Sequence, residues 1–151
     1  MIFLGVDCSS FAIHGVLIDD KEELISVHKW GSPKKEFGDR FPEILVGFYR
    51  EFSRIKEAHF AAIEAAIFIQ NPKTTIAIAN IIGAVWAFLV SKKTGVTIVD
   101  NIQWKKVIVG KGNASKEDIK KFAIAKWGDV FPEQDYADAA CIALWSKRRI
   151  V

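Results

Sequence analysis

The chain has 151 residues, of which 50% are hydrophobic and 26% are charged. This length and composition fit one domain with a buried core, so we exclude collagen-like and disordered proteins and expect residues 1–151 to form a single domain. The 21 basic and 18 acidic residues leave a formal charge of +3, which neither requires nor excludes a polyanionic partner.

Cysteine and histidine are too sparse to indicate a disulfide framework or a zinc site. Cys8 and Cys141 lie far apart in the chain. His14, His28 and His59 are scattered along it, so no histidine ligand cluster is predicted. The apolar run at the amino terminus is ended by an acid after six residues and has no basic region before it, unlike a signal peptide. These features favour a reducing, intracellular location, and we expect the protein in the cytoplasm.

Three short strands are predicted at the start of the chain, over residues 2–7, 11–18 and 24–30. Short polar connections join them, which is typical of an antiparallel meander. The period then changes, because apolar residues recur at steps of three and four between Phe41 and Ile55. That spacing predicts an amphipathic helix.

Later elements alternate between strands and helices. An almost wholly apolar segment, residues 59–69, predicts a central strand, and Val96–Val99 predicts another. Between them, Ile76–Val90 is apolar nearly all round but shorter than the roughly 20 residues that span a membrane, so we interpret it as a buried helix. Ser115–Asp118 has the form of a helix cap, and a last helix is predicted over residues 132–147. The order β-β-β-α-β-α-β-α-α predicts an α/β fold, a mixed five-stranded sheet flanked by helices.

Glu64 stands out among the acids because it is the one charged residue in the segment 61–69. A carboxylate that is buried without a partner costs several kcal/mol or stays protonated. Asp7 repeats this arrangement at the end of the first apolar run, and strand ends are where the sites of α/β proteins gather. Ordinary explanations stay open at this point. Glu64 can face solvent or pair with an internal cation, and Asp7 can be a turn or cap residue.

Asp135 and Asp138 form a third acidic feature at the start of the last predicted helix. Residues three apart share one face of a helix, and beyond Asp138 this helix becomes apolar, so the face points at the core. Two like charges on such a face repel each other unless a cation lies between them. The alternative is a solvated first turn in which acids are favoured by the helix dipole.

Together the four acids indicate a site for metal ions. Carboxylates without nearby His or Cys partners suit hard cations, which means Mg²⁺ or Mn²⁺ and not zinc. Two such ions about 3.5–4 Å apart can activate water and stabilise the leaving oxygen in a phosphodiester displacement. The acids concerned are Asp7, Glu64, Asp135 and Asp138.

At these positions the sequence resembles the RuvC family of Holliday junction resolvases, in the RNase H-like superfamily. The resemblance covers essentially the whole chain, with matching segments in the right order and spacing, and the helix with the aspartate pair is its most specific part. It implies an RNase H-like fold. The segments that carry it are Ile2–Asp7, Ala62–Glu64, Trp104–Gly112, Ser115–Lys116 and Gln134–Leu144.

The resemblance also implies an activity. A homodimer would nick two opposing strands of a four-way DNA junction symmetrically, leaving 5′-phosphate and 3′-hydroxyl ends. The four acids would hold two Mg²⁺ ions per site, with Mn²⁺ as a substitute. Lys116 falls where the family carries a basic residue near the scissile phosphate, and Lys105 matches a second lysine that contacts DNA. The implied catalytic residues are Asp7, Glu64, Asp135, Asp138 and Lys116.

Two features depart from the family pattern. The first aspartate of the family is usually followed by Pro and Gly and then by a Thr-Gly pair, whereas this chain has Cys8-Ser9-Ser10 and His14-Gly15. The family places an aromatic wedge shortly after the glutamate, where this chain has Ile67 beside Phe68, and Phe68 is our candidate for that role. A nuclease of the same fold with a broader preference for flaps and forks is therefore an alternative.

Positive charge is concentrated in one stretch of the chain. Between Val90 and Trp127 there are nine lysines and three acids, a local charge of +6. Such a stretch beside a metal site is predicted to hold a phosphate backbone in a salt-sensitive way, although a charge run can also be a solvated helix face. The candidate DNA-binding residues are Lys105, Lys106, Lys111, Lys116 and Phe68.

The expected partners are branched DNA, in particular a four-way junction, and a second copy of the chain, which the apolar helix 76–90 favours. No membrane partner is expected, and a branch-migration motor stays open. A phosphotransferase of the actin and sugar-kinase type would need a second subdomain and a nucleotide loop, for which 151 residues leave no room. A non-catalytic DNA-binding scaffold is a further alternative, but a scaffold has no use for buried like charges.

Overall fold

The computed structural model describes residues 1–55, 57–67 and 70–150. Five strands form one mixed sheet in the order β3-β2-β1-β4-β5. β1 pairs antiparallel with β2, which pairs antiparallel with β3, while β4 runs parallel to both β1 and β5. The predicted meander and the mixed five-stranded sheet are thereby confirmed. The strands are β1 (Ile2–Cys8), β2 (Ala12–Asp19), β3 (Leu24–Gly31), β4 (Phe60–Glu64) and β5 (Gly95–Val99).

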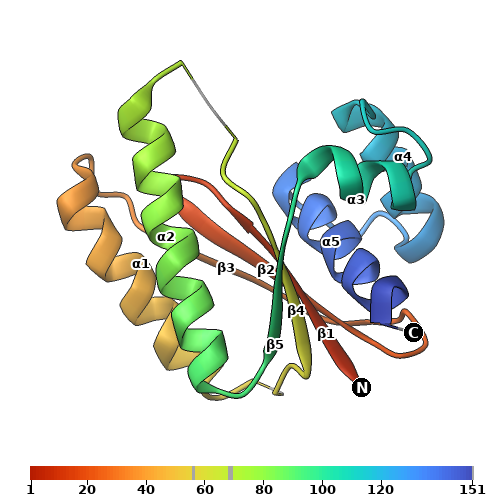
Figure 1. Cartoon of the computed structure of the whole chain (residues 1–151), viewed down its shortest axis with the longest axis horizontal. Coiled ribbons are helices and arrows are strands. Elements are labelled where there is room, and N and C mark those ends of the chain that lie inside the picture. The colour runs from red at the N-terminus through yellow and green to blue at the C-terminus, as the bar shows by residue number, and fades with distance from the viewer. Residues whose placement is uncertain (56, 68–69, 151) are drawn as a thin grey trace.

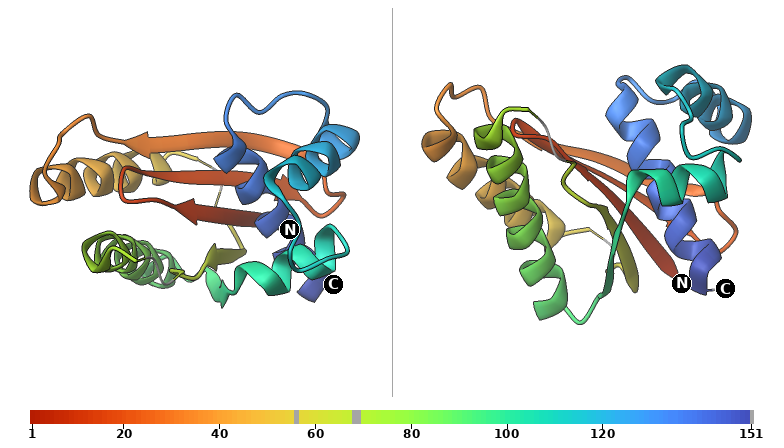
Figure 2. Two further views of the ribbon diagram at one scale, coloured as in Figure 1. Left: turned by 90° about the horizontal axis from the view of Figure 1, so that it is seen from above. Right: turned by 45° about the horizontal axis from the view of Figure 1, so that its top comes forward.

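Helices cover both faces of the sheet. α1 and α2 lie on one face and α3, α4 and α5 on the other, as the two sides of the sheet in Figures 1 and 2 show. Alternation along β1 divides the core accordingly, since Leu4 packs in the cluster that includes α1 and α2 and Phe3 in the one that includes α5. The helices are α1 (Phe37–Phe52), α2 (Pro72–Ser91), α3 (Asn101–Ile108), α4 (Lys116–Trp127) and α5 (Gln134–Ile150).

Gly5 allows α5 to lie directly against β1. A Cβ atom at this position would be 1.9 Å from the backbone oxygen of Ala139 and 2.4 Å from the backbone nitrogen of Ala143. No side chain fits in that space, so the close contact between strand and helix requires glycine. The contact brings the first turn of α5 to the carboxyl end of β1.

The structure differs from the prediction in one strand and one helix. The strand predicted over residues 59–69 ends at Glu64, because its ladder with β1 ends at Ile63 and its ladder with β5 at Glu64 itself. α3 was not predicted at all. The side chain of Asp100 caps it by accepting from the Ile102 backbone N–H at 2.8 Å. The predicted capping box at the start of α4 is confirmed, with Ser115 and Asp118 bonded reciprocally.

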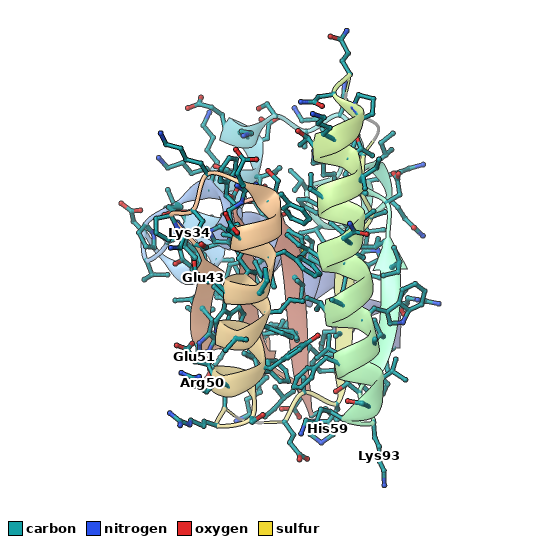
Figure 3. All side chains as sticks on the ribbon, turned by 90° about the vertical axis from the view of Figure 1, so that its left-hand side faces the viewer. Lys34, Glu43, Arg50, Glu51, His59 and Lys93 are labelled. Atoms are coloured by element: carbon teal, nitrogen blue, oxygen red, sulfur yellow. The ribbon has the colours of Figure 1, made fainter. Side chains whose placement is uncertain are left out.

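The prediction that residues 76–90 form a buried helix is wrong in one respect, because only one side of α2 is buried. Its exposed side carries large apolar residues, with Ile76 60%, Trp86 45% and Val90 54% exposed. Within the described ranges, α2 is the one helix whose length and composition would allow it to cross a membrane. Figure 3 shows α1 and α2 side by side over the sheet, with Glu43 and Arg50 labelled on α1.

Candidate metal centre

Asp7 lies near the carboxyl end of β1, two residues beyond Gly5. Because side chains two apart in a strand share a face, its carboxyl group points to the side of the sheet that α5 covers. Its direct cross-strand partner on β2 is His14. Directly opposite residues of an antiparallel pair also share a face, so His14 points to α5 as well.

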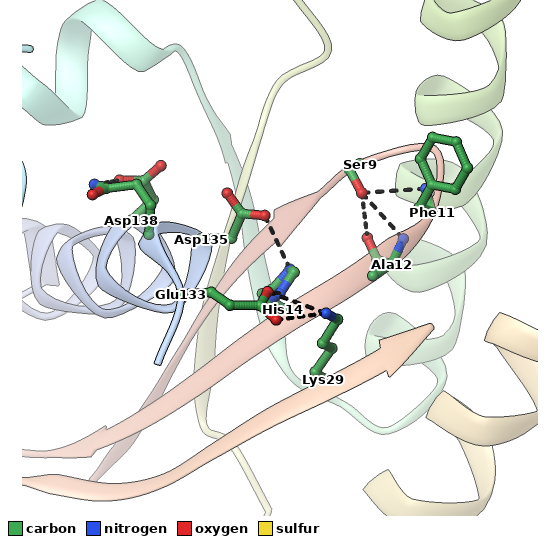
Figure 4. Close-up of polar contacts among 9 residues, drawn as sticks. Ser9, Phe11, Ala12, His14, Lys29, Glu133, Asp135 and Asp138 are labelled. Carbon is green, nitrogen blue, oxygen red and sulfur yellow. Dashed lines mark hydrogen bonds and ion pairs between the residues drawn. The ribbon is translucent and has the colours of Figure 1, made fainter. Parts of the chain in front are cut away.

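The start of α5 supplies two more carboxylates to this place. The donor oxygens of Asp7, Asp135 and Asp138 all lie within 4.8 Å of one another. Figure 4 shows Asp135 and Asp138 next to each other at the start of the helix, and Gln134 donates to Asp138 Oδ1 at 3.0 Å. Residues from opposite ends of the sequence thus form one acidic cluster.

Glu64 approaches the cluster from the neighbouring strand. Val6 of β1 pairs with Ile63 of β4, and Asp7 and Glu64 are the next residues on these two parallel strands. Both line the same small cavity. Glu64 Oε2 accepts a hydrogen bond from Trp104 Nε1 at 2.5 Å. Of the described residues, Glu64 is the predicted ligand that does not belong to the close group of three.

The pKa values of Asp7, Glu64 and Asp138 are raised because their charged forms are desolvated and lie close to other carboxylates. Burial raises the pKa of Asp7 well above its usual value, and the charges of Glu64, Asp138 and Asp135 raise it further. Burial also raises the pKa of Glu64 and that of Asp138. A divalent cation would relieve this repulsion, and the donor set, which is made of carboxylate oxygens, fits Mg²⁺ or Mn²⁺.

Two of the four predicted DNA-binding lysines lie close enough to act on the cluster. The charge of Lys116, at the start of α4, lowers the pKa of Asp7 and of Asp138. The charge of Lys105, on α3, lowers the pKa of Glu64 and of Asp138. These effects are smaller than that of burial, and at Asp7 the effect of Lys116 is also smaller than that of each neighbouring acid.

The other predicted DNA-binding residues have different surroundings. Lys111 forms an ion pair with Asp118 at 2.9 Å, which ties the loop before α4 to the cap of that helix. Lys106 is exposed on α3. Phe68 lies outside the described residues.

A second group of possible metal ligands lies beside the cluster and was not found by sequence analysis, which predicted no histidine ligand cluster. His14, Glu133 and Asp135 bring donor atoms within 4.8 Å of one another, so a single histidine lies beside the acids although the three histidines form no cluster among themselves in the described residues. Lys29, on β3, donates to Glu133 Oε1 at 2.8 Å, and Figure 4 shows it next to Glu133 and His14. The hairpin register, which places position 14 opposite position 7, is the signal that could have found it.

The family model described as crossover junction endodeoxyribonuclease RuvC matches residues 20–145. The chain belongs to the RuvC family. Among curated RuvC proteins, that of Neisseria meningitidis serogroup C is 31% identical over 113 residues, which are 74% of this chain and 63% of that protein. RuvC of Desulfitobacterium hafniense is 26% identical over 95% of this chain and 90% of its own length. The chain therefore spans less than two thirds of the Neisseria relative.

Solved structures of Holliday junction resolvases share the fold. Thermus thermophilus RuvC in complex with a Holliday junction substrate superposes with a TM-score of 0.80 at 21% identity, covering 99% of this chain and 96% of that one. The yeast mitochondrial Holliday junction resolvase Ydc2 has a TM-score of 0.60 at 14% identity, covering 96% and 78%. The predicted RuvC-like, RNase H-like architecture is thereby confirmed.

Proposed function

We propose that this protein is a Mg²⁺-dependent endonuclease that resolves four-way DNA junctions by paired, symmetric nicks. The observation that carries the proposal is the cluster of Asp7, Asp135 and Asp138, whose donor oxygens lie within 4.8 Å of one another beside a basic segment. Membership of the RuvC family supports it. Crowded and partly buried like charges weaken a fold, so a chain that places them at the end of a strand gains something other than stability.

The four acids have a common role in this proposal, which is to hold divalent cations. Mg²⁺ ions, with Mn²⁺ as a substitute and two ions per site, would supply an activated water and stabilise the leaving 3′-oxygen. Trp104 donates to Glu64 and so keeps one carboxylate oxygen turned toward α3. The proposed ligands are Asp7, Glu64, Asp135 and Asp138.

The basic residues would hold and neutralise the DNA backbone. The charge of Lys116 lowers the pKa of Asp7 and of Asp138. This coupling to the acidic cluster supports our assignment of Lys116 to charge stabilisation of the scissile phosphate. Lys105 is assigned to the neighbouring phosphate contacts on the same grounds. Lys106, Lys111 and Phe68 remain proposed DNA contacts. A cytoplasmic location is part of the same proposal.

The proposed active form is a homodimer. A four-way junction has two scissile strands related by a two-fold axis, and an isologous dimer presents two sites with the same symmetry. Ile76, Gly83 and Val90 follow one another at intervals of seven along the exposed side of α2, and Trp86 lies between them. This apolar stripe is the surface we assign to the partner subunit.

Cleavage of an end-labelled four-way junction in Mg²⁺ tests the proposal, beside a linear duplex, a flap and an Asp7→Asn control. We expect paired nicks at symmetric positions in the junction alone, and Asp7→Asn to bind the junction without cutting it. Equal cutting of flaps and forks would instead make the protein a general branch nuclease. Binding without cutting of any substrate would make it a scaffold.

A further inference from the structure

His14 is a buried histidine whose two ring nitrogens have different surroundings. The residue is 2% exposed, and its Nε2 lies 3.0 Å from Glu133 Oε2. An ionised carboxylate only accepts hydrogen bonds, so Nε2 is the donor of this pair. Lys29 holds Glu133 in place by donating to both of its carboxylate oxygens, at 2.8 and 3.1 Å.

The other nitrogen, Nδ1, has no hydrogen-bond partner although it is buried, alone among the side-chain nitrogens and oxygens of the described residues. It faces Asp135 Oδ2 at 3.7 Å, which is too long for a hydrogen bond. In the neutral ring with its hydrogen on Nε2, Nδ1 offers a lone pair. A lone pair and a carboxylate oxygen then face each other, an arrangement that a cation between them would satisfy.

This pattern is the one that metal-binding histidines use. A ligating histidine almost always donates its second ring N–H to a carboxylate or carbonyl, which fixes the tautomer and aims the free nitrogen at the ion. Glu133 is that carboxylate here, and Lys29 orients it. Two donor atoms that share one ion at about 2.0–2.2 Å each lie at most about 4.4 Å apart, so a separation of 3.7 Å is compatible with a shared ion.

We propose that His14 Nδ1 and Asp135 form a nitrogen-containing cation position at the edge of the acidic cluster. Imidazole suits first-row transition metals, whereas Mg²⁺ takes oxygen ligands. This position therefore favours a first-row transition-metal dication over Mg²⁺, and Mn²⁺ is the paramagnetic ion with which it can be probed. The inference rests on the proposed role of Asp135 as a cation ligand, and adds a donor from β2 that the four acids do not include.

An open pocket lies next to His14 and Asp135. It has a volume of ≈ 430 Å³ and is lined among others by Ser9, Phe11, His14, Lys29, Glu133 and Asp135. Ser9 Oγ accepts from the backbone N–H groups of Phe11 and Ala12, which shapes the turn on one side of the pocket.

Pulsed EPR of the protein loaded with Mn²⁺ alone tests the proposal, because it detects a nitrogen nucleus bound to the ion. We expect ¹⁴N modulation in wild type, its loss in His14→Asn, and its retention in His28→Ala. His28 is the matched control, since its Nε2 is bonded to Ser26 Oγ of the same strand, β3, at 2.9 Å. Equilibrium dialysis should show Mn²⁺ affinity reduced at least about 10-fold in His14→Asn, with Mg²⁺ affinity unchanged.

Absence of nitrogen modulation in wild type, or its persistence in His14→Asn, would overturn the inference. The wild-type spectrum needs no variant, so the test holds even if His14→Asn does not fold. Junction cleavage in Mg²⁺ separates this failure from failure of the proposed function. Cleavage without nitrogen coupling would reject the His14 cation position and leave the proposed function standing. Nitrogen coupling without cleavage in any metal would reject the nuclease function and leave the cation position standing.

Discussion

At the scale of single residues, the positions of the clustered acids lower the stability of the folded protein. Asp7 is surrounded by three further carboxylates, and burial contributes more to its raised pKa than any one of them. In the absence of cations, ionisation of such a group near neutral pH costs folding free energy. The same electrostatics that prepare the site for a cation therefore make the empty fold less stable.

Asp7→Asn is expected to raise the Tm in buffer with EDTA, because it removes a partly buried charge that neighbouring carboxylates repel and keeps the shape of the side chain. A gain of 1 kcal/mol corresponds to about 2–4 °C for a domain of this size, and we expect at least this shift. Calorimetry at pH 7.5 measures it. A lower Tm for the variant would mean that the protein itself already compensates the Asp7 charge.

The same acids predict how stability depends on pH. Because the pKa of Asp7 is higher in the folded than in the unfolded chain, the folded state binds more protons between the two values. Without cations, the Tm of wild type is therefore expected to rise as the pH is lowered from 8 toward 5, and to rise less in Asp7→Asn. Melting curves across this range in EDTA measure both slopes, and equal slopes would contradict the assignment.

Trp104 is a positioning residue for Glu64. Its indole is fully buried, and its donated hydrogen bond lowers the pKa of Glu64 against the larger effect of burial. Trp104→Phe is expected to reduce cleavage about 10–100-fold without changing the Kd for the junction, and to move the acidic limb of the pH–rate profile to higher pH. Trp145→Phe, which removes another buried indole, is the control and should keep both rate and profile.

At the scale of elements, the contact between β1 and α5 determines whether the cluster exists. Asp135 and Asp138 reach Asp7 because α5 lies against Gly5 with no side chain between them. Any group at Gly5 must push the helix away from the strand. Since α5 also supplies much of the core on that face, stability and the geometry of the site depend on the same contact.

Gly5→Ala is expected to lower the free energy of unfolding by at least about 3 kcal/mol, because the new methyl group would overlap the backbone of α5. Denaturant titration measures the loss. Gly38→Ala is the matched control, since a Cβ there meets nothing within 4 Å and alanine is favoured in a helix. A Gly5→Ala variant as stable as wild type would mean that α5 can shift without cost.

At the scale of the whole molecule, the exposed side of α2 predicts a dimer. Trp86→Glu places a charge within the apolar stripe and is expected to give monomers at micromolar concentration in sedimentation equilibrium. Unpaired nicks should then replace paired ones in the junction. Val46→Glu, which changes an equally exposed apolar residue on α1, is the control and should leave the dimer intact. A Trp86→Glu protein that stays dimeric would assign the interface to another surface.

The sequence alone was enough to predict the order of most elements, the mixed sheet and the four acids as candidate metal ligands. Periodicity and charges within apolar segments are local properties of the chain. The short α3 escaped it, since Trp104 and Ile108 are the only residues of that helix that are buried. Only the tertiary structure decided that Glu64 is turned toward Trp104, that His14 faces Asp135 and that one side of α2 is left open. These features depend on strand register and on which faces meet, and residues far apart in the chain set both.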